Sequence, residues 1–150
     1  MKRPYINISA PGIKPLPKSP PYRIQINMEN TGTNAAQDLQ ARLLMFDQSL
    51  KSPPIGNIEI GVANDIPPRT PTPYYNDSVL LPRDYPAQFV VMALKYKDAI
   101  TNKNYSQVWY MKWDGIMAGT TSPDFVHVSP EEKSRIVPYV DQYLRKFGIK

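Results

Sequence analysis

The alternation of apolar and polar residues predicts several β-strands in this chain. Residues 22–29 alternate without a break, which is the period of a half-buried strand. Shorter alternating stretches at residues 5–9 and 58–62 predict two further strands. Residues 35–47 fit either a helical face or a strand, and the preceding turn sequence Asn30-Thr-Gly-Thr-Asn34 together with the short span favours the strand.

A hairpin is predicted where two apolar and aromatic runs, residues 87–98 and 105–114, flank the polar sequence 99–104. Both of its faces carry bulky residues. We expect one face to hold Phe89, Val91, Ala93, Trp109, Met111 and Trp113, and the other to hold Val90, Met92, Leu94, Tyr96, Val108 and Tyr110. A pair of strands that is apolar on both sides is expected at the centre of a fold, with a facing sheet on one side and a helix or loop on the other.

A C-terminal amphipathic helix is predicted over residues 129–147. Ser129-Pro-Glu-Glu132 is a capping box with proline in the first helical position. Ile136, Val140, Leu144 and Phe147 form one apolar stripe, and Gly148 is the expected stop. Pro138 lies inside this helix and should kink it or divide it into two pieces.

Proline marks the segments that lie between the predicted strands. The chain has 17 prolines, and none falls in residues 22–52 or 87–122. Because proline cannot donate a hydrogen bond to a ladder, these two windows are where paired sheet is expected. Residues 11–21 predict an extended, polyproline-like connection, and residues 65–86 a proline-rich segment with a short apolar piece at 78–81. Within this segment, Tyr74 and Tyr75 are expected to plug the edge of the sheets.

These patterns together predict an all-β protein, an antiparallel β-sandwich of about seven strands with a C-terminal helix. A chain of 150 residues suits a single domain, residues 1–150. The chain has no cysteine, which excludes disulfides and thiolate metal sites. Its longest apolar run, residues 89–94, is far shorter than the roughly 20 residues that span a bilayer.

Several motifs carry a resemblance to a known class of domain. The strand at residues 22–29 is followed by Asn30-Thr-Gly32 and Ala35-Ala36, and Tyr96-Lys-Asp98 leads through a turn to Tyr105-Ser106. This arrangement resembles immunoglobulin-like β-sandwich domains of bacterial membrane-anchored or cell-surface proteins of unassigned function, over about half of the chain. In such domains the glycine of the turn supplies a left-handed conformation. The resemblance implies a periplasmic or cell-surface location in a membrane-anchored parent protein. Whether a membrane helix precedes residue 1 stays open, and so does a cytoplasmic location. The cysteines of the antibody-type bridge are absent.

The sequence offers little catalytic chemistry. His127 is the single histidine, so a Ser-His-Asp triad would have to use it, with Ser122, Asp124 and Ser129 as the nearby partners. The surrounding Phe125, Val126 and Val128 instead indicate a terminal strand. No glycine-rich phosphate-binding motif and no run of acidic metal ligands is present, and we expect neither cofactor nor metal.

We therefore expect a non-catalytic binding or structural module whose partner is a protein or an envelope component. The expected binding surface comprises Tyr74, Tyr75, Lys95, Lys97, Lys103 and Lys112. The net charge of +5, together with lysines beside the aromatic residues of the hairpin, leaves single-stranded nucleic acid as an alternative partner. A hydrolase centred on His127 is a third, weaker hypothesis.

Overall fold

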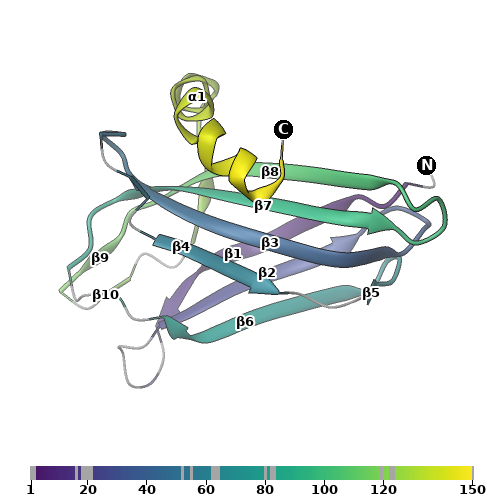
Figure 1. The fold of residues 1–150 in the computed structure, drawn as a ribbon. Helices are drawn as coiled ribbons and strands as arrows, with labels where there is room; N and C mark the ends of the chain where they lie inside the picture. The colour runs from purple at the N-terminus through teal and green to yellow at the C-terminus, as the bar shows by residue number, and fades with distance from the viewer. Residues whose placement is uncertain are drawn as a thin grey trace.

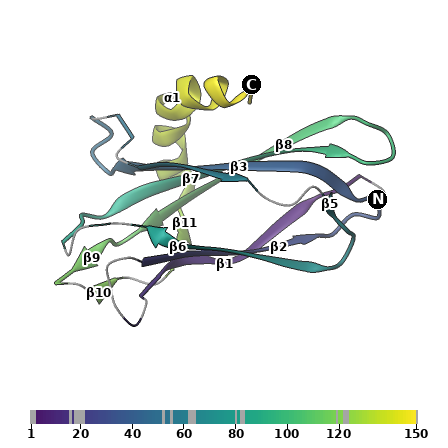
Figure 2. The same ribbon diagram turned by 60° about the horizontal axis from the view of Figure 1, so that its bottom comes forward.

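The protein is mostly β-structure with antiparallel sheets and one C-terminal helix, as the sequence predicts. The structure, a computed structural model, describes residues 3–15, 17, 22–51, 53–54, 56–61, 65–79, 81, 84–118, 120–121 and 124–149. Figures 1 and 2 show two main sheets that lie one above the other, with the helix on the outer side of the larger sheet.

The smaller sheet has the strand order β1-β2-β6, formed by β1 (Ile6–Pro15), β2 (Tyr22–Asn30) and β6 (Pro71–Val79). The larger sheet has the order β11-β8-β7-β3-β4, formed by β11 (Val126–His127), β8 (Asn104–Trp113), β7 (Gln88–Asp98), β3 (Ala36–Asp47) and β4 (Gly56–Gly61). The short β5 (Asp65–Ile66) also pairs with β3, and β9 (Ile116–Met117) pairs with β10 (Thr120–Thr121) in a separate small ribbon. Every pairing between these strands is antiparallel.

The main hydrophobic core lies between the two sheets. Strand β2 alternates between buried and half-buried residues along its whole length, as its sequence period predicts. Its inward residues Ile24 and Ile26 belong to the same buried cluster as Val90, Met92 and Leu94 of β7. The strand favoured for residues 35–47 and both strands of the predicted hairpin are also confirmed.

Helix α1 (Pro130–Phe147) begins with the expected capping box and ends at Gly148, whose φ of 93° is left-handed. The four residues of its predicted stripe, Ile136, Val140, Leu144 and Phe147, are all buried. Pro138 does not divide the helix, because α1 is continuous across it, although the ribbon bends along its length (Figure 2). Among the described residues, no helix combines the length and apolar character needed to cross a membrane.

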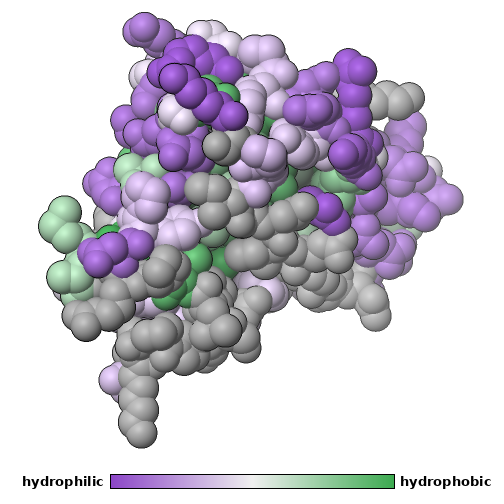
Figure 3. Space-filling model, turned by 60° about the vertical axis from the view of Figure 1, so that its left-hand side comes forward, coloured by the Kyte–Doolittle hydropathy of each residue, from purple (hydrophilic) through white to green (hydrophobic). Residues whose placement is uncertain are grey.

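A second hydrophobic cluster lies between α1 and the outer face of the larger sheet. It contains the helix stripe together with Leu44 and Phe46 of β3 and Phe89, Val91 and Ala93 of β7. The predicted central hairpin is therefore covered on both faces, by the smaller sheet and by the helix. Figure 3 shows that the upper part of one side of the molecule, where α1 lies, is mainly hydrophilic, as expected for the solvent side of an amphipathic helix.

The distribution of residues between the faces of β8 differs from the prediction. Val90 pairs with Met111 and Met92 pairs with Trp109, and in an antiparallel ladder directly opposed residues point to the same face. Met111, Trp109 and Trp113 therefore share the core face with Val90 and Met92, and Val108 and Tyr110 lie on the helix side. The predicted grouping was wrong because alternation fixes the period of each strand but not the register between them.

Proline-rich strands account for two further differences. Strand β1 runs to Pro15 instead of ending at residue 9, with a register irregularity between Ser9 and Gly12. The segment that contains Pro71 and Pro73 forms strand β6 rather than a loop. Both β1 and β6 are outer strands of their sheet, where a missing amide proton can face away from the ladder. Residues 16 and 18–21 of the predicted connection, and residue 80 of the predicted apolar piece, lie outside the described residues.

Candidate functional site

The structure distributes the six residues of the predicted binding surface over three separate places. Tyr74 and Tyr75 lie on β6 in the smaller sheet, away from the lysines of the larger sheet. Lys95 and Lys97 lie near the end of β7, and Lys103 lies in the exposed turn that follows. Lys112 pairs with Phe89 at the other end of the hairpin, six residues along β7 from Lys95, which is about 20 Å.

Tyr74 and Tyr75 point to opposite sides of β6. Tyr74 is partly buried and packs against the main core, so it fills part of the space between the sheets. Tyr75 is 51% exposed, and the guanidinium carbon of Arg23 lies 4.8 Å from its ring centroid. Only Tyr74 therefore acts as the expected plug.

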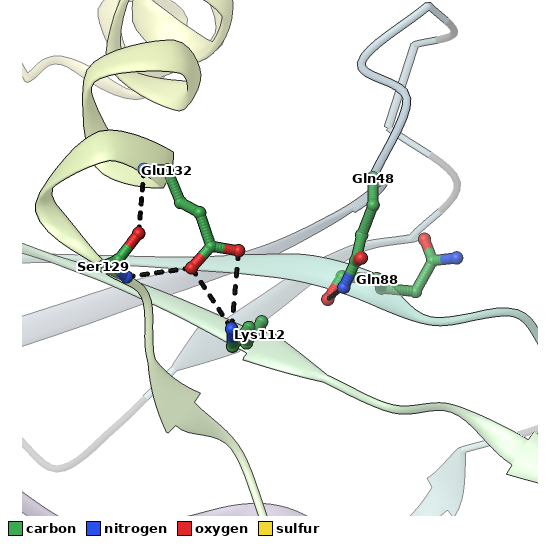
Figure 4. Close-up of polar contacts among 5 residues, drawn as sticks. All are labelled: Gln48, Gln88, Lys112, Ser129 and Glu132. Atoms are coloured by element: carbon green, nitrogen blue, oxygen red, sulfur yellow. Dashed lines mark hydrogen bonds and ion pairs between the residues drawn. The ribbon is translucent and has the colours of Figure 1, made fainter.

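Lys112 has a structural role beneath the start of α1. Its Nζ lies 3.2 Å from Oε1 of Glu132 and 3.4 Å from Oε2, and the backbone amide of Ser129 donates to the same carboxylate at 2.9 Å (Figure 4). The hydrogen bond from Ser129 is the main cause that lowers the pKa of Glu132, and Lys112 lowers it further. The lysine thus joins β8 to the capping box of the helix. In the same view, the Gln48 side-chain amide donates to the backbone oxygen of Gln88 at 3.4 Å, which joins the turn after β3 to β7.

Lys95 and Lys97 line an open groove of about 810 Å³ on the outer face of the larger sheet. We call it the Lys95–Lys97 groove. Its walls come from three neighbouring strands and from Gly148 after the helix, and its lining residues are Asp38, Gln40, Lys95, Tyr96, Lys97, Asn104, Tyr105, Ser106 and Gly148. The groove exists because α1 ends at Phe147 and leaves this end of the sheet uncovered.

The register of the strands places the polar residues of the groove in rows. Gln40, Lys95 and Ser106 are directly opposed across β3, β7 and β8, and Lys97 is opposed to Asn104 in the next row. The side chains of Gln40, Lys97, Asn104 and Ser106 make no hydrogen bond or ion pair within the described part of the chain. These groups are therefore available to a ligand.

Lys95 forms the boundary between the helix and the groove. Its Nζ donates to the backbone oxygen of Phe147 at 2.8 Å and lies 4.6 Å from the ring centroid of the same residue. A cation at the end of a helix is favourable because it neutralises the carbonyl groups that lack a helical partner. The ammonium keeps further N–H donors beyond the one that Phe147 accepts.

The aromatic residues beside these lysines pack against other parts of the protein. Trp113 is 1% exposed, and Trp109 and Tyr105 pack against the main core. The Tyr105 ring also lies 4.5 Å from the guanidinium carbon of Arg3. Burial raises the pKa of Tyr96 to about 12, against a smaller lowering by Arg3, and its hydroxyl donates to the backbone oxygen of Pro4 at 3.1 Å. The groove therefore does not offer the row of free rings that stacks the bases of a single strand.

His127 lies on β11, exposed and paired with Met111. Its ring forms no hydrogen bond with any residue whose position is described. Asp124 instead accepts from Lys14 at 2.8 Å, and the hydroxyl of Ser129 accepts from the amide of Glu132 at 3.1 Å. Ser122 lies outside the described residues. Within the same limits, no group of three His, Asp or Glu side chains is placed to hold a metal ion.

Sequence reasoning missed Asp38, Gln40, Asn104 and Ser106. Polar residues of this kind are common on exposed strands. The predicted hairpin places β8 beside β7, but no signal in the sequence indicates which of its residues lie opposite Lys95 and Lys97, or that β3 lies on the other side of β7. The register of the three strands supplies that information.

Comparison with known proteins reveals similarity at the level of fold. No protein-family model matches the chain, and no curated protein matches it. A crystal structure of a Bordetella pertussis protein designated ApaA has a TM-score of 0.54 and 14% sequence identity, covering 77% of this chain and 96% of that one. The X-ray structure of the structural-genomics target SoR45 has a TM-score of 0.46 and 15% identity, covering 85% of this chain and 87% of that one. The first likeness shows that the mostly β fold of this chain is shared with a solved structure.

Proposed function

We propose that this chain is a non-catalytic, immunoglobulin-like binding or structural module that contacts a protein partner or envelope component through the Lys95–Lys97 groove. The observation that carries the proposal is the groove itself. It places three polar side chains without described partners, Gln40, Asn104 and Ser106, on the sheet beside Lys95 and Lys97. Such an arrangement can bind a ligand through hydrogen bonds and charge without any chemical step.

The order of the strands supports the immunoglobulin-like part of the proposal. In the constant-type domain the first, second, fourth and fifth strands form one sheet and the third, sixth and seventh form the other. Counting the longer strands here in chain order, β1, β2 and β6 are the first, second and fifth, and they share a sheet. Strands β3, β7 and β8 are the third, sixth and seventh, and they share the other sheet, where β4 joins them as an edge strand.

The positions of the described triad candidates support the non-catalytic part. A nucleophile and its base must lie within hydrogen-bonding reach of one another. In the described parts of the molecule His127 has no such partner, and the two described candidates, Asp124 and Ser129, bond elsewhere. The proposed extracytoplasmic location follows from the resemblance stated above.

The test measures whether the immobilised wild-type protein and two variants retain an envelope component. Lys97→Glu reverses a charge inside the groove, and Lys103→Glu makes the same change in the exposed turn outside it. We expect material from an envelope fraction of the encoding organism to be retained by the wild type and by Lys103→Glu, and lost with Lys97→Glu.

Retention of nothing above background would overturn the binding role. Equal retention by all three proteins would overturn the assignment of that role to the groove. Circular dichroism of each variant establishes that the fold is intact before the comparison is made.

A further inference from the structure

We infer that the Lys95–Lys97 groove binds an extended acidic peptide segment, with carboxylates at alternate positions, from a protein partner. This inference rests on the proposed function and adds the chemical class of the ligand. It is drawn from the spacing of the two lysines, the set of free polar groups around them and the charges that line the groove.

The spacing of the lysines matches that of an extended peptide. Lys95 and Lys97 are two residues apart on β7 and point to the same face, so their Cβ atoms are separated by about 6.7 Å. An extended peptide repeats its own side chains on one face at the same interval. A segment running along β7 therefore brings two alternate carboxylates over the two ammonium groups.

The neighbouring side chains suit the backbone of such a segment. Gln40 on β3 and Ser106 on β8 flank Lys95, and Asn104 on β8 lies opposite Lys97. Amide and hydroxyl groups both donate and accept, so they can bond the N–H and C=O groups of a peptide that lies between them. The groove is open to solvent, and exposed ion pairs are weak and screened by salt, so we expect reversible, salt-sensitive binding.

The same surroundings disfavour a nucleic acid. Asp38 places a carboxylate in the lining of the groove, and the C-terminal end of α1 at Gly148 adds the negative end of the helix dipole. Both repel an acidic peptide as well as a nucleic acid, so the choice between the two ligands rests on the spacing of the lysines and on the tyrosines. Tyr96 is only 3% exposed, and Arg3 lies over the Tyr105 ring, so these two tyrosines are occupied within the fold. Peptide carboxylates need two cations at the right spacing, whereas a bound single strand draws on a longer run of positive charge and on free aromatic faces.

The experiment measures fluorescence anisotropy of a labelled peptide of about ten residues in which Glu and Ser alternate. We expect saturable binding that weakens about fivefold or more with Lys97→Glu, and by less than about twofold with Lys103→Glu. Ser106→Glu, which introduces a carboxylate from a different strand, should weaken binding as Lys97→Glu does. This second variant keeps the test valid if Lys97→Glu fails to fold.

Two further probes decide the ligand class. A peptide of alternating Lys and Ser should not bind, and a labelled single-stranded oligonucleotide of similar length should bind more weakly than the acidic peptide. An oligonucleotide that binds more tightly, with the same dependence on Lys97, would overturn the peptide in favour of nucleic acid. If the acidic peptide fails to bind but retention of an envelope component still depends on Lys97, only the ligand class is overturned. If neither the peptide nor an envelope component is retained, the proposed function is overturned as well.

Discussion

Asn30 joins three segments of the chain through its buried side chain: the segment at Tyr5, its own turn and the segment at Ile66. Its Oδ1 accepts from the amides of Tyr5 and Gly32, and its Nδ2 donates to the backbone oxygens of Asn34 and Ile66. The Asn-x-Gly sequence was expected to mark a turn in which glycine is left-handed, but Gly32 is not among the residues with positive φ. Glycine is required here by close packing: a Cβ at residue 32 would lie 2.0 Å from the backbone oxygen of Arg3.

We predict that Gly32→Ala destabilises the protein by about 2 kcal/mol or more, because the added methyl group meets backbone atoms that cannot rotate away. Urea unfolding followed by tryptophan fluorescence measures the loss. Thr33→Ala, an exposed change in the same turn, is the control and should alter the free energy of unfolding by less than about 0.5 kcal/mol. Equal stability of the two variants would contradict this packing argument.

Asp98 is a second residue whose side chain joins segments at this end of the molecule through hydrogen bonds. Its carboxylate accepts from the Asn34 side-chain amide at 3.2 and 3.0 Å and from the amides of Ile100 and Thr101 at 2.8 and 3.2 Å. Burial raises the pKa of Asp98, but these hydrogen bonds outweigh it, and the net result is a pKa below the ordinary value.

The sign of this shift gives a pH dependence. A carboxyl group whose pKa is lower in the folded state stabilises that state fully when the pH is above its unfolded pKa of about 3.9. This stabilisation is lost as the pH falls through the pKa of the folded state. We therefore expect Asp98→Asn to be less stable than the wild type at pH 7, with a difference that shrinks below about pH 4. Urea unfolding over a pH series measures it. Asp114→Asn, an exposed change, should follow the wild type, and a constant difference for Asp98→Asn down to the lowest pH would refute the prediction.

At the scale of the element, helix α1 depends on packing as well as on its caps. Propensity alone does not favour a helix with Pro138 in its interior, because that proline lacks an amide to bond to the preceding turn. Four buried side chains on one stripe and the two lysines at its ends, Lys112 at Glu132 and Lys95 at Phe147, hold it on the sheet. The capping box and the stripe are local patterns, so the sequence was sufficient to predict this element.

Substitutions at two neighbouring residues of α1 distinguish the contribution of packing to stability from that of helix propensity. Ile136 is 0% exposed and Val137 is 40% exposed. We predict that Ile136→Ala lowers the free energy of unfolding by about 2–4 kcal/mol, and Val137→Ala by less than about 0.5 kcal/mol. Thermal or urea unfolding followed by circular dichroism gives both values. A small effect of Ile136→Ala would mean that the helix contributes little to the stability of the sheet.

At the scale of the whole molecule, β3 and β7 connect the two hydrophobic clusters. Leu43 and Met92 face the smaller sheet, whereas the adjacent Leu44 and Val91 face the helix. Loss of either cluster therefore exposes one side of the same two strands. We therefore expect the two sheets and the helix to unfold as a single cooperative unit.

We predict one two-state unfolding transition. Fluorescence of Trp109 and Trp113, which both pack in the main core, and far-ultraviolet circular dichroism, which includes α1, should give the same midpoint in urea. A helix signal that disappears at a lower urea concentration than the tryptophan signal would show instead that α1 unfolds independently. The Ile136→Ala variant should shift both signals together.

The elements whose signal is local can be predicted from the sequence. The unbroken alternation of β2, the two runs of the β7–β8 hairpin and the capped, amphipathic α1 all depend on residues close together in the chain. How these elements combine is visible only in the folded molecule. The tertiary structure set the register that places Met111 and Trp109 on the core face, and it gave β6 the edge position that accommodates Pro71 and Pro73. It also separated Lys112 from Lys95 and brought Gln40 and Ser106 beside the latter. Side-chain period is a property of one strand, whereas register, edge position and a groove depend on contacts between segments far apart in the sequence.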